Sequence, residues 1–167
     1  MLAPLGLRLF CRNIKLSIKN MSEKCLGCYY NKHPEKEIGG KIKEYNYWNL
    51  KHVDKPVPHQ GWLILNTKRH VVGIAGMNKN EAKELAEILF TVPKAIKKIA
   101  KAKMVYIVCM TEAVKHLHIH IIPRYENDKI RGGDLFALNG LVKKGKIKPV
   151  PAAKCLAIIK KLKKELN

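Results

Sequence analysis

Three histidines alternate with aliphatic residues in the second half of the chain: His116, His118 and His120 are separated by Leu117 and Ile119. Successive side chains of a strand point to opposite faces, so this spacing predicts three imidazole rings on one face of a strand. A neutral imidazole is a nucleophile, a charged one binds phosphate, and either ring nitrogen can ligate zinc. The alternation therefore favours a catalytic or metal-binding strand over a purely structural one.

Cys25 and Cys28 form a second group of residues that could do chemistry. Their two-residue spacing lets a tight turn direct both thiolates at one tetrahedral cation. The same spacing also serves redox dithiols, and two unrelated buried thiols are a third interpretation. A metal site would need two further ligands. The total of five cysteines is odd, which does not suit a secreted disulfide framework and favours a reducing, intracellular setting.

Residues 116–122, followed by Pro123, Arg124 and Tyr125, resemble the signature of the histidine triad (HIT) superfamily of nucleotide hydrolases and transferases. Residues 61–70 (GWLILNTKRH) are similar to the hydrophobic strand of that family that ends in a Lys/Arg-His pair. The resemblance covers residues 25–125. It implies an enzyme that cleaves dinucleoside polyphosphates or nucleoside phosphoramidates at the α-phosphate, and it implies a homodimer.

The resemblance also implies roles for individual residues. In zinc-containing members of the family, a Cys-x-x-Cys pair joins two histidines, and the matching set here is Cys25, Cys28, His70 and His116. These four residues are expected to form a closed, structural zinc site. His118 is then the expected nucleophile, which forms a nucleotidyl-histidine intermediate. His120 is expected to bind the non-bridging phosphate oxygens and to stabilise charge as it develops.

Two positions depart from the family pattern. Trp62 stands where the family has a phosphate-binding histidine, and His59, three residues earlier, is a candidate substitute. Glu112, or its neighbour Thr111, stands where the family has a glutamine. A carboxylate at that place repels phosphate oxygens unless it is protonated or faces the leaving group, so the departure bears on leaving-group preference.

Three further residues are candidate substrate ligands. Asp54 matches the acidic position that holds the ribose hydroxyls in the family, and a turn aspartate before Pro56 is the alternative interpretation. Lys68 would attract phosphates, although a charged residue beside a strand end is commonly only solvated. Arg124 either contacts phosphate or caps its strand.

The length of 167 residues and a hydrophobic content of 47% predict one compact domain. The net charge of +20 favours polyanionic partners such as nucleotides, nucleic acids or anionic membrane surfaces, although a solvated lysine-rich face would also explain it. No apolar run approaches the length of about 20 residues that crosses a bilayer, so no transmembrane segment is expected. The predicted location is cytoplasmic, with mitochondria as the alternative.

Residues 1–21 are basic and lack acidic residues. They are predicted to be a flexible extension, or a mitochondrial presequence. Residues 22–167 are predicted to form a single HIT-like domain, with a core at 25–125 and a C-terminal extension at 126–167.

The apolar pattern predicts an α+β domain with a HIT-like antiparallel sheet, a main helix and a C-terminal amphipathic helix. Strands are expected around residues 42–48, 62–66 and 104–110, besides the histidine strand, with Cys109 in the core. The main helix is expected at 81–102 after capping asparagines, with Pro93 kinking or dividing it. The C-terminal helix is expected at 152–166, with Leu156, Ile159 and Leu162 on its apolar side.

Two other functions fit these residues. The basic ends of the chain favour an enzyme that removes adenylate from nucleic-acid ends. The altered phosphate site favours a nucleotide- or RNA-binding module with little catalysis.

Overall fold

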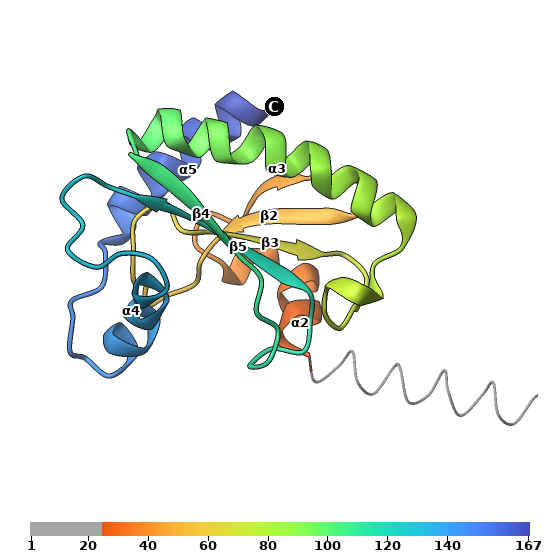
Figure 1. The fold of residues 1–167 in the computed structure, drawn as a ribbon, viewed down its shortest axis with the longest axis horizontal. Helices are drawn as coiled ribbons and strands as arrows, with labels where there is room; N and C mark the ends of the chain where they lie inside the picture. The colour runs from red at the N-terminus through yellow and green to blue at the C-terminus, as the bar shows by residue number, and fades with distance from the viewer. Residues whose placement is uncertain (1–24) are drawn as a thin grey trace, which may run out of the picture.

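The computed structural model describes residues 25–167, and the predicted extension or presequence at residues 1–21 lies outside them. Its centre is a five-stranded antiparallel sheet in the order β1-β2-β3-β5-β4 (Figure 1). The strands are β1 (Lys41–Glu44), β2 (Trp48–His52), β3 (Leu63–Thr67), β4 (Met104–Val108) and β5 (His118–Arg124). The longer helices are α2 (Leu26–Lys32), α3 (Lys79–Ala100), α4 (Asp134–Lys143) and α5 (Ala152–Leu166). The predicted α+β class with an antiparallel sheet is confirmed.

Helices cover both faces of the sheet. Figure 1 shows α3 and α5 on one face and α2 and α4 on the other. All residues of the central strands β2 and β3 are accordingly buried. Because neighbours along a strand alternate between faces, Leu63 and Leu65 belong to one face while Ile64 and Asn66 belong to the other. The second face carries the alternate histidines of β5, since Ile64 pairs with His120 and Asn66 with His118.

The main helix, α3, begins directly after Asn78, one of the two predicted capping asparagines and two residues before the expected start. The side chain of Asn78 accepts from the backbone of Glu81, and the Glu81 carboxylate accepts from the backbone of Asn78. Of the two effects predicted for Pro93, a kink or a division of the helix, the division is wrong, because α3 runs through the proline without interruption. A proline inside a helix costs about 3 kcal/mol, whereas each large apolar side chain buried on the sheet contributes about 1.5–3 kcal/mol. The buried apolar residues stand on both sides of the proline: Leu85, Ile88, Val92, Ala95 and Ile96.

The C-terminal helix, α5, has the predicted bounds, but its buried side differs from the prediction. The buried residues are Cys155, Ile158, Ile159 and Leu162, whereas Leu156 is exposed. Helix α4 was not predicted, because Gly132 and Gly133 indicate only a loop. Its buried residues Leu135, Leu138 and Val142 recur at helical spacing over only ten residues, which is a weak signal in a sequence.

Strand β4 lies at an edge of the sheet and pairs only with β5. The predicted strand is present, but the side chains of Met104 and Ile107 are each 44% exposed. The prediction that Cys109 belongs to the core is wrong, because the residue just after this edge strand is exposed. Among residues 25–167, no helix is both long enough and apolar enough to cross a bilayer.

Candidate active site and metal centre

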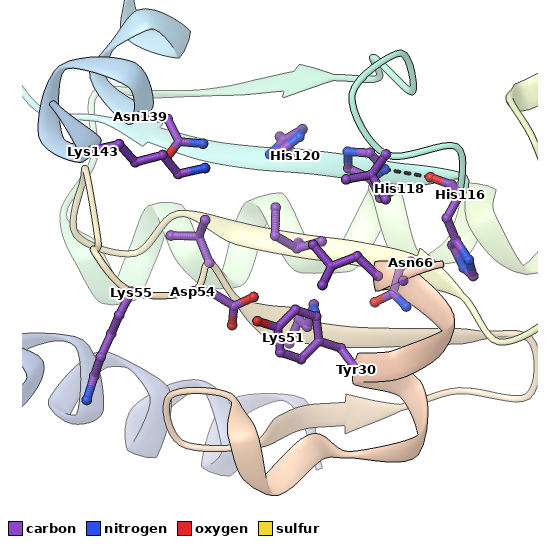
Figure 2. Close-up of a pocket in the computed structure, with 15 residues that line it drawn as sticks. Tyr30, Lys51, Asp54, Lys55, Asn66, His116, His118, His120, Asn139 and Lys143 are labelled. Atoms are coloured by element: carbon purple, nitrogen blue, oxygen red, sulfur yellow. Dashed lines mark hydrogen bonds between the residues drawn. The ribbon is translucent and has the colours of Figure 1, made fainter. Parts of the chain in front are cut away.

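A pocket of about 240 Å³ lies on the sheet face that carries the histidines, between α2 and α4. Its lining combines all three central strands with both helices: Lys51 from β2, Ile64 and Asn66 from β3, His118 and His120 from β5, Tyr30 from α2, and Asn139 and Lys143 from α4. Figure 2 shows Asn139 and Lys143 extending from α4 toward the space between β5 and the loop that carries Asp54. The histidine row, which consists of His116, His118 and His120, therefore faces a cavity rather than the core.

The ring of His118 is held in one tautomer. Its Nδ1 lies 2.6 Å from the carbonyl oxygen of His116, drawn as a dashed line in Figure 2. A carbonyl oxygen only accepts hydrogen bonds, so Nδ1 carries the proton and donates it. The lone pair of the ring is then on Nε2, and the half-buried ring lines the pocket. This is the tautomer that a neutral imidazole nucleophile requires.

The ring of His120 is held in the opposite tautomer. The indole Nε1 of Trp62 donates to Nδ1 of His120 across 2.9 Å. An indole N–H only donates, so Nδ1 is the acceptor and the ring proton resides on Nε2. Burial, and then the neighbouring His118, lower the pKa of His120 to about 3. The ring is therefore neutral at physiological pH and presents a hydrogen-bond donor.

Asp54 lies across the pocket from the histidine row. Its Oδ1 is buried, and no residue within 25–167 donates to it. Burial raises the pKa of this carboxyl, while Lys51 and the Tyr30 hydroxyl act in the opposite direction. Lys51 in turn forms an ion pair with Glu37 and lies 4.3 Å from the ring centre of Tyr30. The pocket thus offers an acceptor beside an aromatic wall.

The four predicted metal ligands come together beside the pocket. The ligand atoms of Cys25, Cys28, His70 and His116 all lie within 4.8 Å of one another. The sulfur of Cys25 is 3.4 Å from Nδ1 of His116, and that of Cys28 is 3.4 Å from Nδ1 of His70. Donors at zinc bond lengths around a tetrahedral centre stand roughly 3.3–3.8 Å apart. The geometry and the donor set therefore fit zinc.

The surroundings of the four ligands also fit a metal. Nε2 of His116 donates to the carbonyl oxygen of Thr67 at 2.8 Å, which leaves Nδ1 free to ligate. Burial, and then the neighbouring thiol of Cys25, raise the pKa of Cys28 to about 11. A dication at the centre reverses this preference, because a coordinating thiol is deprotonated. A cluster of two thiols and two imidazoles is thus suited to a cation.

Two of the other predicted substrate ligands are engaged away from the pocket. His59 is buried, with its Nε2 at 3.1 Å from the carboxylate of Asp128 and its ring stacked on Tyr125. The ammonium of Lys68 lies 2.7 Å from the Glu44 carboxylate. Neither residue lines the cavity between α2 and α4.

The remaining two, Arg124 and Glu112, also lie outside the pocket lining. Arg124 is at the far end of β5, where its guanidinium donates to the carbonyl oxygen of Tyr125. Glu112 is exposed on the loop between β4 and β5. The cavity as a whole therefore holds His118, His120 and Asp54 from the predicted substrate and catalytic set, together with the metal ligand His116.

Sequence reasoning missed Gly27, Tyr30, Asn139 and Lys143. Gly27 stands between the paired cysteines. Its position inside a metal-binding motif is the sequence feature that could have identified it. Tyr30 lies two residues beyond that motif. Asn139 and Lys143 lie on the unpredicted helix α4, and nothing local in the sequence marks them.

The family model of the HIT domain matches residues 48–127. No curated protein is similar enough in sequence to match the chain.

Several solved structures share the fold. A HIT-like protein involved in cell-cycle regulation from Bartonella henselae is 16% identical, with 85% of this chain and 96% of that chain covered and a TM-score of 0.64. A hypothetical histidine triad nucleotide-binding protein from Sulfolobus tokodaii is 19% identical, with coverage of 85% and 91% and a TM-score of 0.64. A zinc-bound histidine triad family protein from Mycobacterium smegmatis is 17% identical, with coverage of 86% and 96% and a TM-score of 0.63.

Proposed function

Since this chain is a member of the histidine triad (HIT) superfamily, we propose that it is a nucleotide hydrolase or nucleotidyltransferase that cleaves its substrate at the α-phosphate. The observation that carries the proposal is the pairing of two rings whose hydrogen bonds fix opposite tautomers at the pocket. His118 offers a lone pair on Nε2, and His120 offers a proton on Nε2. Their ring centres are 5.0 Å apart, so one phosphoryl group can meet both.

The proposed reaction has two steps. In the first, Nε2 of His118 forms a bond to the α-phosphorus, and the bond from phosphorus to the leaving group breaks with its electron pair on the leaving group. In the second, the oxygen of a water molecule bonds to phosphorus, the phosphorus–nitrogen bond breaks, and the water proton passes to solvent. The Nε2–H of His120 stabilises the charge that develops on a non-bridging oxygen.

The nucleoside is proposed to occupy the part of the pocket that Tyr30 and Asp54 line together. The unpartnered carboxylate oxygen of Asp54 suits the ribose hydroxyls, because a carboxylate accepts from two donors. Lys143 is the basic side chain at the α4 side of the pocket and favours a polyanionic substrate. His59, Lys68, Glu112 and Arg124 are proposed only for parts of a substrate that extend beyond the pocket. The Sulfolobus tokodaii protein, named as nucleotide-binding, supports a nucleotide ligand.

A structural zinc ion is proposed at Cys25, Cys28, His70 and His116, supported by the donor geometry and by the zinc-bound Mycobacterium smegmatis relative. When bound, the ion would supply coordination bonds that hold α2 against the strands of the sheet. His116 would then be committed to the metal through Nδ1, while its backbone carbonyl orients His118. The metal centre would thereby fix the wall of the pocket that Tyr30 provides.

A homodimer is proposed through the open edge of the sheet. The side chains of Met104, Ile107 and Met110 along this edge are each at least 44% exposed. A second sheet edge or helix would bury them and the unpaired backbone groups of β4. A cytoplasmic location is proposed, with mitochondria as the alternative should residues 1–21 act as a presequence.

Nucleic-acid ends are the second candidate substrate, favoured by the exposed lysines of α5. Lys160, Lys161 and Lys164 add to a net charge of +20. Affinity for oligonucleotides should then fall steeply with salt, because each neutralised phosphate releases counterions. Salt-insensitive, weak binding to an oligonucleotide beside tight binding of a mononucleotide would exclude a nucleic-acid role, including that of an RNA-binding module.

The activity is tested with a panel of adenylylated compounds incubated with the full chain. Release of AMP from a member of the panel is expected, and His118→Ala should abolish it while the melting temperature changes little. His33→Ala is the matched control, since His33 is an exposed histidine outside the pocket. Undiminished AMP release by His118→Ala would refute the proposed nucleophile.

A further inference from the structure

Trp62 is a fully buried indole with one polar contact, its donation to Nδ1 of His120. The contact joins the start of β3 to β5, because Ile64 of β3 pairs with His120 of β5. Phe136 of α4 closes the arrangement, because its ring packs edge-on against His120 at 4.7 Å and lies 5.5 Å from Trp62. The indole is thus packed between the sheet and α4.

An indole N–H that points at Nδ1 excludes a proton from that nitrogen. To act as a general acid, an imidazole must first carry protons on both nitrogens. Protonated Nδ1 would place two hydrogens face to face and break the Trp62 hydrogen bond. The single proton on Nε2 of a neutral ring is too weakly acidic to be given to a leaving group. His120 therefore donates a hydrogen bond without supplying a proton.

The other groups around His120 offer no substitute acid. The three rings in contact with it are Trp62, which directly precedes β3, Phe136 from α4 and His118 from β5. The side chains of Trp62 and Phe136 are not acids at physiological pH. The Nδ1 proton of His118 is held by a backbone carbonyl. Further along α4, Asn139 does not titrate and Lys143 acts on the Asp54 carboxyl. Neither His120 nor the rings in contact with it therefore supply a proton to the leaving group.

We propose that Trp62 is a positioning residue that fixes His120 as a neutral donor and thereby restricts the site to leaving groups that depart as stable anions. The proposal rests on the proposed nucleotidyl transfer to His118. A nucleotide phosphoanhydride fits, because its α-phosphorus–oxygen bond breaks to leave a phosphate anion that needs no proton. A nucleoside phosphoramidate of an alkylamine does not fit, because its phosphorus–nitrogen bond breaks only when the nitrogen gains a proton.

The tautomer is tested by nitrogen NMR of the full chain labelled at histidine. In the wild type, Nδ1 of His120 is expected to resonate as an unprotonated nitrogen and Nε2 as a protonated one. Trp62→Phe should lose this pattern, because the donor is gone while an aromatic ring remains. Trp48→Phe is the matched control, since the indole of buried Trp48 donates instead to the carbonyl oxygen of Glu81. A wild-type proton on Nδ1, or an unaltered pattern in Trp62→Phe, would overturn the proposal.

The restriction is tested by comparing an adenosine phosphoanhydride with an adenosine phosphoramidate of an alkylamine. General acid catalysis contributes about 10²–10⁴-fold, so the wild type should favour the anhydride in kcat/KM by at least about 100-fold. Trp62→His introduces a ring that can carry and deliver a proton. It should therefore lower the ratio of kcat/KM for the anhydride to kcat/KM for the phosphoramidate. Equal use of both compounds by the wild type would overturn the restriction while leaving the proposed function intact. Turnover of neither would overturn the proposed function and the restriction together, and the NMR result would still decide the tautomer.

Discussion

Gly27 lies so close to His116 that a Cβ atom at position 27 would stand 2.4 Å from Cγ of the imidazole. The glycine sits between the two cysteines at the start of α2, and this absence of a side chain lets the helix approach the ring. The close approach brings both thiols to the histidine nitrogens. One glycine thus couples the Cys-x-x-Cys motif to the histidine row.

Gly27→Ala is expected to push α2 away from His116 and to weaken metal binding. The Cβ would meet ring atoms of a buried, hydrogen-bonded side chain that has no room to move. Zinc content after purification and the melting temperature should both fall. Gly140→Ala is the control, because a Cβ there meets nothing within 4 Å and alanine favours a helix. Full zinc content in Gly27→Ala would contradict the packing argument.

Removal of zinc by a chelator is expected to lower the melting temperature. Bound ligand present at 100 to 1,000 times its Kd stabilises by about 2.7–4.1 kcal/mol. For a chain of this size that corresponds to a fall of about 5–16 °C. Differential scanning calorimetry with and without chelator measures it, and Cys28→Ser should reproduce the fall without further sensitivity to chelator. An unchanged melting temperature would show that the four residues hold no structural ion.

The neutral state of His120 predicts a pH dependence of stability. Burial lowers the pKa of this ring to about 3 in the folded chain, below the value near 6.5 of a free histidine. The unfolded chain therefore binds the extra proton first, and stability is lost as the pH falls below about 6.5. His120→Asn should be less sensitive to acid than the wild type between pH 7 and 5. Denaturant unfolding at several pH values tests this, and parallel curves for the two proteins would contradict it.

Asp54→Asn is expected to raise KM about 10-fold or more with a smaller change in kcat, because a hydrogen bond to a charged group is worth about 1.5–3 kcal/mol. The proposed contact of Asp54 is with the ribose hydroxyls and not with the reacting phosphoryl group. A substrate without these hydroxyls supplies the control, since the wild type should lose affinity for it while Asp54→Asn should not. If removal of the ribose hydroxyls lowered the affinity of the wild type and of Asp54→Asn equally, contact between Asp54 and the ribose would be excluded.

The chemistry on β5 and α2 was predictable because its patterns are local. Alternation along a strand puts His118 and His120 on one face whatever the rest of the fold, and the cysteine spacing is similarly self-contained. The partner of each ring was not predictable. The hydrogen bond between Trp62 and His120 joins residues 58 positions apart and depends on the register of β3 against β5.

Burial was the second property that the sequence left open. The apolar run of β4 predicts a strand, but nothing in it shows that the strand lies at an edge, and so Cys109 was wrongly expected in the core. Helix α4 illustrates the same limit. Asn139 and Lys143 reach the pocket only because the buried face of α4 packs beneath the sheet, and that packing is a tertiary interaction.

The role of His118 as the nucleophile is tested by mass spectrometry of the full chain quenched during turnover of an adenosine phosphoanhydride. The quench is kept at alkaline pH because a bond between phosphorus and imidazole is labile in acid. One adenylyl group per chain is expected on a peptide that contains His118, and none in His118→Ala. An adenylyl group on a different residue, or turnover without any covalent adduct in both proteins, would contradict it.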